Sequence, residues 1–397
     1  GIKRTDNRTS PVHLRYEYDS PGEKIIKIYG NNKGYSLGNN YEYQIINPCK
    51  YLVKAELAWD LPKLTHYSFK GASIEKFPLT EYLTSVAIGT FSACNKVKTL
   101  ELPLSITILE DNAFEACEGL EGTITLPKSL TRMGNYIFNR CSNITGIKFE
   151  CSKLTSLGDW VFSSCTSLEE VEIPEFITSI GDNCFSFCTK LSKLKFVNSN
   201  LKVGYYSVQG CNELKTAGPI GSVDSEGYPV NIEYAWKYGI PDYAFAAGQN
   251  QSYLIECILP SDADNTLTTI GDSAFMNTRL RTIKLPSSLK TIKQKAFVFS
   301  SLSTISIPEN TRIIGSQVFG GCNSLQTVKI YSDYVDDNSK VWSANDSWFA
   351  LSKTTVHIYI PKELYNDKSK WAEAYGPYWN YFNEDENLDE NVRPIED

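Results

Sequence analysis

The amino-acid sequence predicts a repeat solenoid of about 11 coils with a parallel β-sheet along one face, and three observations carry this prediction. A phenylalanine followed three residues later by a cysteine returns about every 23 positions. A short segment of alternating apolar and polar residues, often closed by proline, follows the cysteine. A turn with an Ile-Gly or Met-Gly step, where glycine accepts backbone angles that other residues resist, leads to the next phenylalanine. A fixed period of this length is typical of solenoids, in which each unit packs only on its neighbours.

Residues 1–48 precede the repeats and are predicted to form an N-terminal cap. The segment HLRYEYDSPGEKIIKIYG (13–30) alternates on both sides of a Pro-Gly step, which is typical of a β-hairpin. Such a cap would hide the apolar edge of the first coil from water. A separate binding module is the alternative for this stretch.

Residues 49–361 hold the repeats. The copies with both marker residues are Phe91/Cys94, Phe114/Cys117, Phe138/Cys141, Phe162/Cys165, Phe185/Cys188 and Phe319/Cys322. In the first five, successive phenylalanines are 23, 24, 24 and 23 positions apart. Val208/Cys211 continues the series, Phe245, Phe275 and Phe297 follow with Gly248, Thr278 and Ser300 at the cysteine position, and Phe349 with Ser352 is interpreted as the last turn. One coil cannot bury its own apolar face, so the stacked coils are expected to share one continuous core.

Each alternating segment is predicted to be a strand of the sheet. Examples are VKTLELP (97–103), LEEVEIP (168–174), LRTIKLP (280–286) and LSTISIP (302–308). In the third, period-two alternation places Ile283 and Leu285 inward and leaves the residues between them outward. Proline cannot donate to a strand ladder, so it ends the strand.

The outward positions of successive strands are expected to form rows that mix Glu, Lys and Thr. Four charged residues of these rows are candidate ligand-binding residues: Glu170, Glu172, Lys193 and Lys195.

Seven of the 11 cysteines occupy the same place in successive repeats. Equivalent positions in stacked coils would form a ladder of small, buried, polarisable side chains, which suits unpaired cysteine. Neighbouring rungs would lie about 5 Å apart, so disulfides are not sterically excluded. We expect free thiols, because the repeat also uses Thr, Ser or Gly at this place.

Irregular insertions interrupt the repeats at about 218–244 and at 331–348. In and next to the first, five aromatic residues fall within sixteen positions: Tyr228, Tyr234, Trp236, Tyr238 and Tyr243. Aromatic faces stack on sugars or fill protein hot spots at small entropic cost, so these residues are the first choice for a ligand site. The alternative is that the rings pack back on the solenoid as a small local core.

The second insertion, YSDYVDDNSKVWSANDSW, is rich in Asp and Asn. Its spacing lacks the glycine and the terminal glutamate of a calcium loop. A solvated acidic loop is therefore expected, and no metal site.

Residues 362–397 are predicted to form a C-terminal cap followed by an acidic tail. The aromatic residues between 371 and 379 are expected to cover the edge of the final coil. The tail NEDENLDENVRPIED (383–397) is expected to be disordered or nearly so, because it is strongly charged and poor in apolar residues.

The consensus of the unit, C-x-x-L-x-x-I-x-L-P-x-S-L-T-x-I-G-x-x-A-F-x-x-C, resembles the BspA-like type of leucine-rich repeat (LRR type 5) over residues 49–361. The resemblance implies a leucine-rich repeat array that a strand and a short helix close at 356–382. Members of that family are typically secreted or surface-anchored proteins of gut and oral anaerobic bacteria, and several are adhesins that bind host matrix proteins. It therefore implies an extracellular or outer-surface location, in an anaerobic setting that suits free thiols. The visible chain has no leader-like segment, so a secretion signal or lipid anchor is expected upstream of Gly1.

Composition and motifs argue against several classes of function. The net charge is −7 and the pI is about 5.3, and the outward rows lack the basic stripe of a nucleic-acid binder. No run of 18 apolar residues predicts a transmembrane segment. The three histidines, His13, His66 and His357, are too scattered for one metal site, and there is no nucleophile elbow, phosphate loop or dinucleotide fingerprint. The sequence thus predicts no enzyme, no cofactor and no metal.

The leading functional hypothesis is a non-enzymatic, adhesin-like protein that recognises an extracellular protein through the repeat face or the aromatic insertion. A polysaccharide-binding module of a nutrient-capture system is the second hypothesis. A structural spacer is the third. The sequence leaves the ligand and the oligomeric state open.

Overall fold

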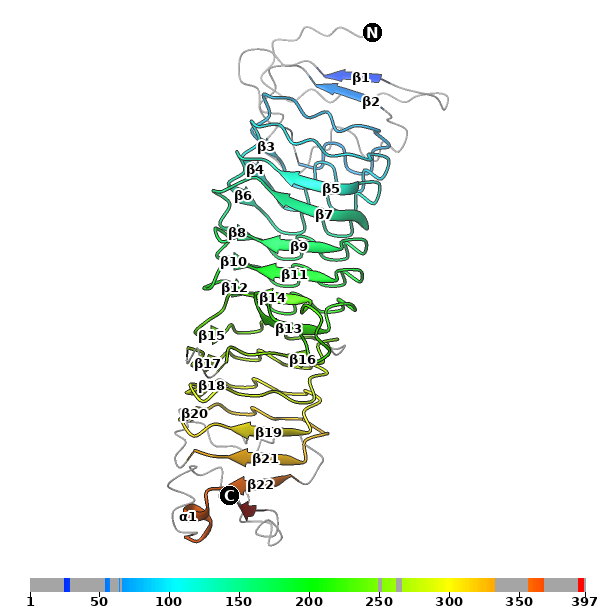
Figure 1. Cartoon of the computed structure of the whole chain (residues 1–397). Helices are drawn as coiled ribbons and strands as arrows, with labels where there is room; N and C mark the ends of the chain where they lie inside the picture. Colours follow the sequence, from blue (N-terminus) through cyan, green and yellow to red (C-terminus); the bar gives the residue numbers. More distant parts are fainter. Residues whose placement is uncertain are drawn as a thin grey trace.

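A computed structural model describes residues 25–28, 54–57, 64, 66–248, 252–261, 266–332, 356–367 and 392–395. It confirms the predicted solenoid. The coils stack into an elongated rod, with β1 near one end and β22 and α1 near the other (Figure 1).

Parallel strands form one face of the rod in two sheets (Figure 1). The first has seven strands: β5 (Glu121–Leu126), β7 (Asn143–Phe149), β9 (Glu170–Ile173), β11 (Lys193–Phe196), β13 (Thr216–Pro219), β14 (Ile232–Tyr234) and β16 (Glu256–Cys257). The second has four: β19 (Thr304–Ile307), β21 (Thr327–Ile330), β22 (His357–Ile360) and β23 (Val392–Pro394). In β9 and β19 exposed and buried residues alternate, as a half-buried sheet requires.

Two of the predicted strands are absent from these sheets. Neither 97–103 nor 280–286 forms a strand, although Ile283 and Leu285 are buried and Thr282 and Lys284 are exposed as expected. The alternation of apolar and polar residues predicts which side chains are buried. A hydrogen-bonded strand ladder also needs the backbone of a neighbouring coil at strand spacing. The prediction was therefore right about burial and wrong about pairing at these two segments.

A second set of short parallel strands runs along the edge where only turns were expected. Its members are β3 (Ser85–Val86), β4 (Ile108–Leu109), β6 (Arg132–Met133), β8 (Ser156–Leu157), β10 (Ser179–Ile180), β12 (Lys202–Val203), β15 (Gly239–Ile240), β17 (Thr269–Ile270), β18 (Thr291–Ile292) and β20 (Ile313–Ile314). In each of these two-residue strands the side chain of the second residue is buried. The isoleucine of the Ile-Gly step is thus the last residue of a short paired strand, and the step is more than a corner.

Glycine is needed at this step because neighbouring coils pack closely there, and not because the backbone adopts an unusual angle. A Cβ at Gly158 would lie 2.5 Å from the carbonyl oxygen of Gly134 in the preceding coil, well inside van der Waals contact. The left-handed backbone falls instead two residues before and two residues after the anchor phenylalanine, for example at Tyr136 (φ 57°) and Arg140 (φ 63°) on either side of Phe138. The sequence-based explanation of the glycine was therefore wrong.

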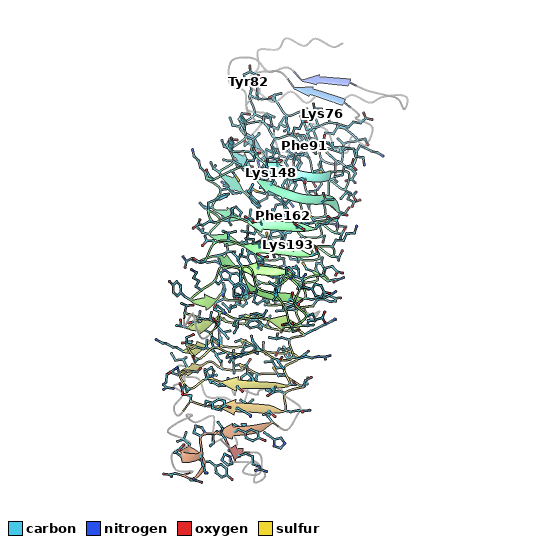
Figure 2. The ribbon with its side chains drawn as sticks, in the orientation of Figure 1. Lys76, Tyr82, Phe91, Lys148, Phe162 and Lys193 are labelled. Atoms are coloured by element: carbon cyan, nitrogen blue, oxygen red, sulfur yellow. The ribbon has the colours of Figure 1, made fainter. Side chains whose placement is uncertain are left out.

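The anchor phenylalanines are buried in the core, as predicted, and from Phe91 to Phe185 they stack in a column. From Phe91 to Phe185, neighbouring rings lie 5.6–5.7 Å apart between centroids and within 13° of parallel. All of these side chains are fully buried, and Figure 2 labels Phe91 and Phe162 within the column. Stacked aromatic pairs of this kind stabilise a core beyond the area that they bury.

Ten cysteines lie in described residues and are free and buried, as expected, while Cys49 lies outside the described residues. In seven of them the Sγ atom donates to the carbonyl oxygen of an anchor residue in the preceding coil, at 3.0–3.2 Å. Burial raises the pKa of thiols such as that of Cys141 well above the ordinary value of 9.0. The cysteine ladder is therefore a set of protonated hydrogen-bond donors.

The two ends of the rod carry added strands. β1 (Ile25–Ile28) pairs in parallel with β2 (Lys54–Leu57), and the expected first arm of the N-terminal hairpin lies outside the described residues. At the other end, the short helix α1 (Lys362–Tyr365) follows β22, and β23 pairs in parallel with β22. The expectation of disorder was thus wrong for residues 392–394, which extend the sheet.

Three further expectations concern residues outside those that the structure describes. The last turn at Phe349 and the acidic loop after Ser332 lie outside the described residues. The aromatic residues expected to cover the final coil, between 371 and 379, also lie outside them.

Candidate functional site

The first insertion adds a strand to the face out of chain order. β14 follows β13 in sequence, yet it lies between β11 and β13, with Ile232 opposite both Leu194 and Ala217. The side chain of Asn231 fixes this position, because its Oδ1 accepts from the amide of Lys215 and its Nδ2 donates to the carbonyl of Ser192. The insertion is therefore built into the sheet.

Two of the five candidate aromatic residues are core residues. Tyr234 and Trp236 are each 1% exposed, and their rings stack with centroids 5.0 Å apart. Trp236 also stacks on Phe196, and the Tyr234 hydroxyl donates to the carbonyl of Ile258 at 2.6 Å. Both side chains occupy inward positions of an alternating segment, so neither offers a face to a ligand. For these two residues the local-core alternative is correct.

The other three aromatic residues lie at separate places. Tyr228 is 66% exposed on the insertion loop beside the strand face, and Tyr238 is 65% exposed just before β15. Tyr243 lies in the turn after β15 against Tyr205, with ring centroids 3.8 Å apart. Burial and a hydrogen bond with Tyr205 raise the pKa of Tyr243. The structure does not bring the five rings together, and a ligand role for the three outer rings stays a prediction.

The four charged candidates of the strand rows lie side by side. Lys193 faces Glu170 and Lys195 faces Glu172 across β9 and β11, as the predicted rows require. Lys195 Nζ lies 3.2 Å from a Glu172 carboxylate oxygen, an ion pair at the surface. Figure 2 labels Lys193 on this face. Exposed pairs of this kind contribute little energy, and opposite charges on neighbouring strands leave no net charge to attract a ligand. Their role in binding stays a prediction.

The outer part of the insertion is a small hairpin held against β16. Val223 and Pro229 form an antiparallel bridge, and Asp224 Oδ1 accepts from the amides of Glu226 and Tyr228. Both carboxylate oxygens of Glu256 are engaged here, since Ser225 donates to one from its amide at 2.9 Å and to the other from its hydroxyl at 2.8 Å. The hairpin (residues 223–229) therefore has a fixed place on the strand face.

Beside this hairpin the strand face is hollowed. The hollow has a volume of about 1010 Å³, and it is lined by Ser225, residues 255–261, Arg279, residues 281–284, Pro286 and Ser301. It lies between β16 and the segment 279–286, where the two sheets of the face are separate. The loop residues 262–265 lie outside the described residues.

The charge of the hollow is mainly positive among its described residues. Arg279, Arg281 and Lys284 are exposed at its wall, and the Arg279 guanidinium lies 4.4 Å from the ring centroid of Tyr253. Glu256 is the one carboxylate among the lining residues, and Ser225 engages it. Ile255, 50% exposed, adds an apolar surface. These features suit a ligand with negative charges and an apolar component.

Sequence analysis missed this site. One signal was available: the spacing from Phe245 to Phe275 is 30 positions, longer than the repeat, and three cations follow within ten residues. The loss of pairing at 280–286 gave no signal, because LRTIKLP reads like any other strand of the array.

The described residues hold no cluster of three or more His, Cys, Asp or Glu side chains that is arranged to bind a metal ion. No helix in the described part of the chain is both long and apolar enough to cross a bilayer.

Comparisons with known proteins agree with this architecture. The family described as the BspA type Leucine rich repeat region matches residues 62–152, 85–215 and 239–369, in 6 copies. A comparison with curated proteins gave no match.

Three solved structures are similar to this chain to different degrees. A leucine-rich repeat protein from Bacteroides ovatus is 22% identical, with a TM-score of 0.52 over 81% of this chain and 86% of that one. A leucine rich cell surface protein from Faecalibacterium prausnitzii is 19% identical, with a TM-score of 0.40 over 84% of this chain and 92% of that one. The pneumococcal vaccine antigen PcpA is 20% identical, with a TM-score of 0.34 over 79% of this chain and 76% of that one.

Proposed function

Because the chain belongs to the BspA-type leucine-rich repeat family, we propose that it is a non-enzymatic binding protein of the cell surface. Its partner is an extracellular macromolecule, in the manner of an adhesin, and the contact surface is the hollow beside hairpin 223–229. The remaining strand rows act as a rigid support that holds this surface in place.

The hollow itself carries the proposal. It is the point where the regular repeat is broken by an insertion, and irregular parts of a solenoid are where specific contacts concentrate. It combines exposed cations, an exposed isoleucine and a fixed hairpin wall, which together give charge, apolar area and shape to a contact. The ion-paired row at Glu172 and Lys195 offers none of these.

The non-enzymatic part of the proposal has a separate basis. An open strand face does not desolvate carboxylates, so the pairs on it are poorly placed for acid–base work. The cysteine thiols are buried and hydrogen-bonded, with raised pKa values, which is the opposite of what a nucleophile needs.

A polysaccharide ligand is the second candidate. It is favoured by Tyr228, whose exposed ring stands on the hairpin beside the hollow. An aromatic face next to hydrogen-bonding groups suits a sugar ring. A structural spacer, the third hypothesis, gains no support from the hollow and is kept as an outcome of the test.

The test is a binding screen of purified protein against immobilised matrix proteins and a polysaccharide panel. One variant has residues 223–229 replaced by a short Gly-Ser linker, which spares the buried Tyr234 and Trp236. A matched control, Tyr82→Ser, changes an exposed ring near the N-terminal end of the rod, far from the hollow (Figure 2). Binding to a protein that only the linker variant loses, with unchanged circular dichroism, is the expected result.

Other outcomes overturn the proposal in defined ways. Binding that the linker variant keeps moves the contact away from the hollow. Binding to a polysaccharide alone favours the glycan module. If the protein binds nothing in either panel, the structural spacer becomes the favoured hypothesis.

A further inference from the structure

The two segments that wall the hollow are joined at one end and open at the other. A parallel bridge connects Ser252 to Thr278, and the amide of Ser252 donates to the carbonyl of Asn277 at 2.9 Å. Farther along, β16 and residues 281–285 share no ladder. The gap between residues 255–259 and 281–285 is therefore a wedge in the sheet.

The register shows which backbone groups this opening leaves without strand partners. On the other side of β16, the amides of Glu256 and Ile258 donate to the carbonyls of Lys215 and Ala217. The same register one coil later would make the amides of Thr282 and Lys284 donate to the carbonyls of Ile255 and Cys257. Neither bond forms, and no amide from Thr282 to Leu285 donates to the carbonyl of a described residue.

Such an arrangement has the backbone chemistry of a strand-addition site. Residues 281–285 form no strand and share no ladder with β16 or β19, so their backbone groups are open beside the edge of β16. An extended peptide placed between the two would donate to β16 and accept from residues 282–284, and main-chain pairing of this kind is how peptides add to exposed sheet edges. Carbonyls would face it from β16 and amides from residues 282–284. To pair with both walls in the sense of this sheet, the added strand would run parallel to them.

Charge sets the kind of peptide. Arg279, Arg281 and Lys284 are exposed at the wedge, and the carboxylate of Glu256 is already bonded to Ser225. Side chains of an added strand alternate between the two faces of the sheet, so its outward positions would meet these cations. Acidic residues at alternate positions would match them.

We propose that the wedge binds an extended acidic segment of a partner protein as an added parallel strand. The inference rests on the proposed function and deepens it, because it names the chemical class that the contact surface takes. The contact then has two separable parts, the backbone pairing and the charge pairing.

The test uses a synthetic acetylated and amidated peptide of sequence Thr-Glu-Val-Glu-Thr-Glu-Val-Glu-Thr-Glu as the probe. Titration calorimetry measures its binding to the full chain at about 50 mM and about 300 mM salt, because charge pairing is screened over this range. Three comparison ligands are the same peptide with Lys for Glu, a version N-methylated at alternate amides, and heparin as an anionic polysaccharide.

Two protein variants locate the binding. The wedge variant is Arg279→Gln, Arg281→Gln, Lys284→Gln. The matched control, Lys128→Gln, Lys148→Gln, Lys153→Gln, removes the same charge from exposed positions outside the wedge. Circular dichroism verifies that both are folded.

The expected result is binding of the acidic peptide that the wedge variant weakens at least about tenfold and the control leaves unchanged, with loss on N-methylation and at high salt. No binding of the acidic peptide, or equal binding by the wedge variant, overturns the inference. Equal binding of the N-methylated peptide overturns strand addition. Heparin binding through the same cations without peptide binding assigns the wedge to an acidic glycan. Failure here, with a matrix protein still bound through hairpin 223–229, overturns the inference and leaves the proposed function standing.

Discussion

The thiol of Cys141 donates a hydrogen bond to the carbonyl oxygen of Phe114, 27 positions earlier, at 3.2 Å. Both residues are fully buried, so water cannot replace this bond. The same contact recurs wherever the repeat holds a cysteine at this position, from Cys94 to Cys322. This hydrogen bond connects each such coil to the one before it, so it is expected to contribute to the stability of the stack.

Replacing Cys141 separates the role of the donor from that of the volume. Cys141→Val keeps an apolar side chain of similar size but removes one of the two donors to the Phe114 carbonyl, which still accepts from the amide of Cys117 at 3.3 Å. A loss of about 0.5–1.5 kcal/mol is expected. Cys141→Ser keeps a hydroxyl donor at this place, which a serine, Ser300, occupies in a later coil, and it should cost less. Thermal unfolding followed by circular dichroism measures the difference. Equal loss in both variants would show that the hydrogen bond contributes nothing.

The buried thiols should be unreactive in the folded protein. Burial raises the pKa of Cys94 to about 12, so almost no thiolate exists near neutral pH. A chromogenic disulfide reagent at about pH 8 should label the described cysteines only after urea is added. The Cys49→Ser variant serves as background, because Cys49 lies outside the described residues. Fast labelling of that variant without urea would contradict the buried ladder.

The same pKa shift predicts a loss of stability in alkaline solution. Burial, opposed in part by hydrogen bonds at Ser300, raises the pKa of Cys322 to about 11 from its ordinary value of 9.0. Between these values the unfolded chain has released the thiol proton and the folded chain has not, so stability falls as pH rises. Below pH 9.0 both states are protonated and this thiol adds no pH dependence.

Unfolding temperatures at about pH 8 and about pH 10 measure this effect. The wild type should lose more stability between the two than Cys322→Ser, whose hydroxyl does not titrate there. Identical losses would remove Cys322 as a cause.

The glycine before each turn should be intolerant of a methyl group. In Gly158→Ala the new Cβ meets the carbonyl oxygen of Gly134 and the side chain of Asn135, each at 2.5 Å, so the coils must separate. A cost of about 1–3 kcal/mol is expected in urea unfolding. Gly146→Ala is the matched control, since its nearest contact is the movable Thr123 hydroxyl at 3.0 Å. A larger effect at Gly146 would contradict close coil contact as the reason why glycine recurs at this place in successive repeats.

The insertion should divide into a core part and a surface part. Trp236→Ala removes a fully buried ring that stacks on Phe196, and a loss of about 3–5 kcal/mol is expected. Tyr228→Ala changes an exposed ring and should shift stability by less than about 0.5 kcal/mol. Unfolding of both variants in urea tests this division. A stable Trp236→Ala protein would return that residue to the list of ligand candidates.

The repeated features were predictable from sequence because each recurs at a fixed spacing. The phenylalanine column, the inward strand positions and the free thiols all follow from equivalent places in stacked coils. The out-of-order strand β14 was visible as the alternation of Ile232, Tyr234 and Trp236, but a run of aromatic residues in an insertion also fits a ligand site. Only the hydrogen bonds of Asn231 to Lys215 and Ser192, which hold β14 within the sheet, decide between a core strand and a ligand site.

The wedge had no such signal. LRTIKLP at 280–286 and LSTISIP at 302–308 have the same pattern, yet only the second forms a strand. Whether a segment pairs depends on whether a neighbouring backbone lies at strand spacing. Residues 280–286 share no ladder with β16 or with β19, although the step from Phe275 to Phe297 is a regular 22 positions. A pattern within seven residues does not contain this information.

Hydrogen exchange of the free protein tests the wedge most directly. Amides from Thr282 to Leu285 should exchange much faster than those of β21 (Thr327–Ile330), because β21 is paired in a ladder on both sides. Addition of the acidic peptide should slow exchange at Thr282 and Lys284 and leave β21 unchanged. Slow exchange of residues 282–285 in the free protein, equal to that of β21, would mean that the sheet is continuous there and that the wedge does not exist.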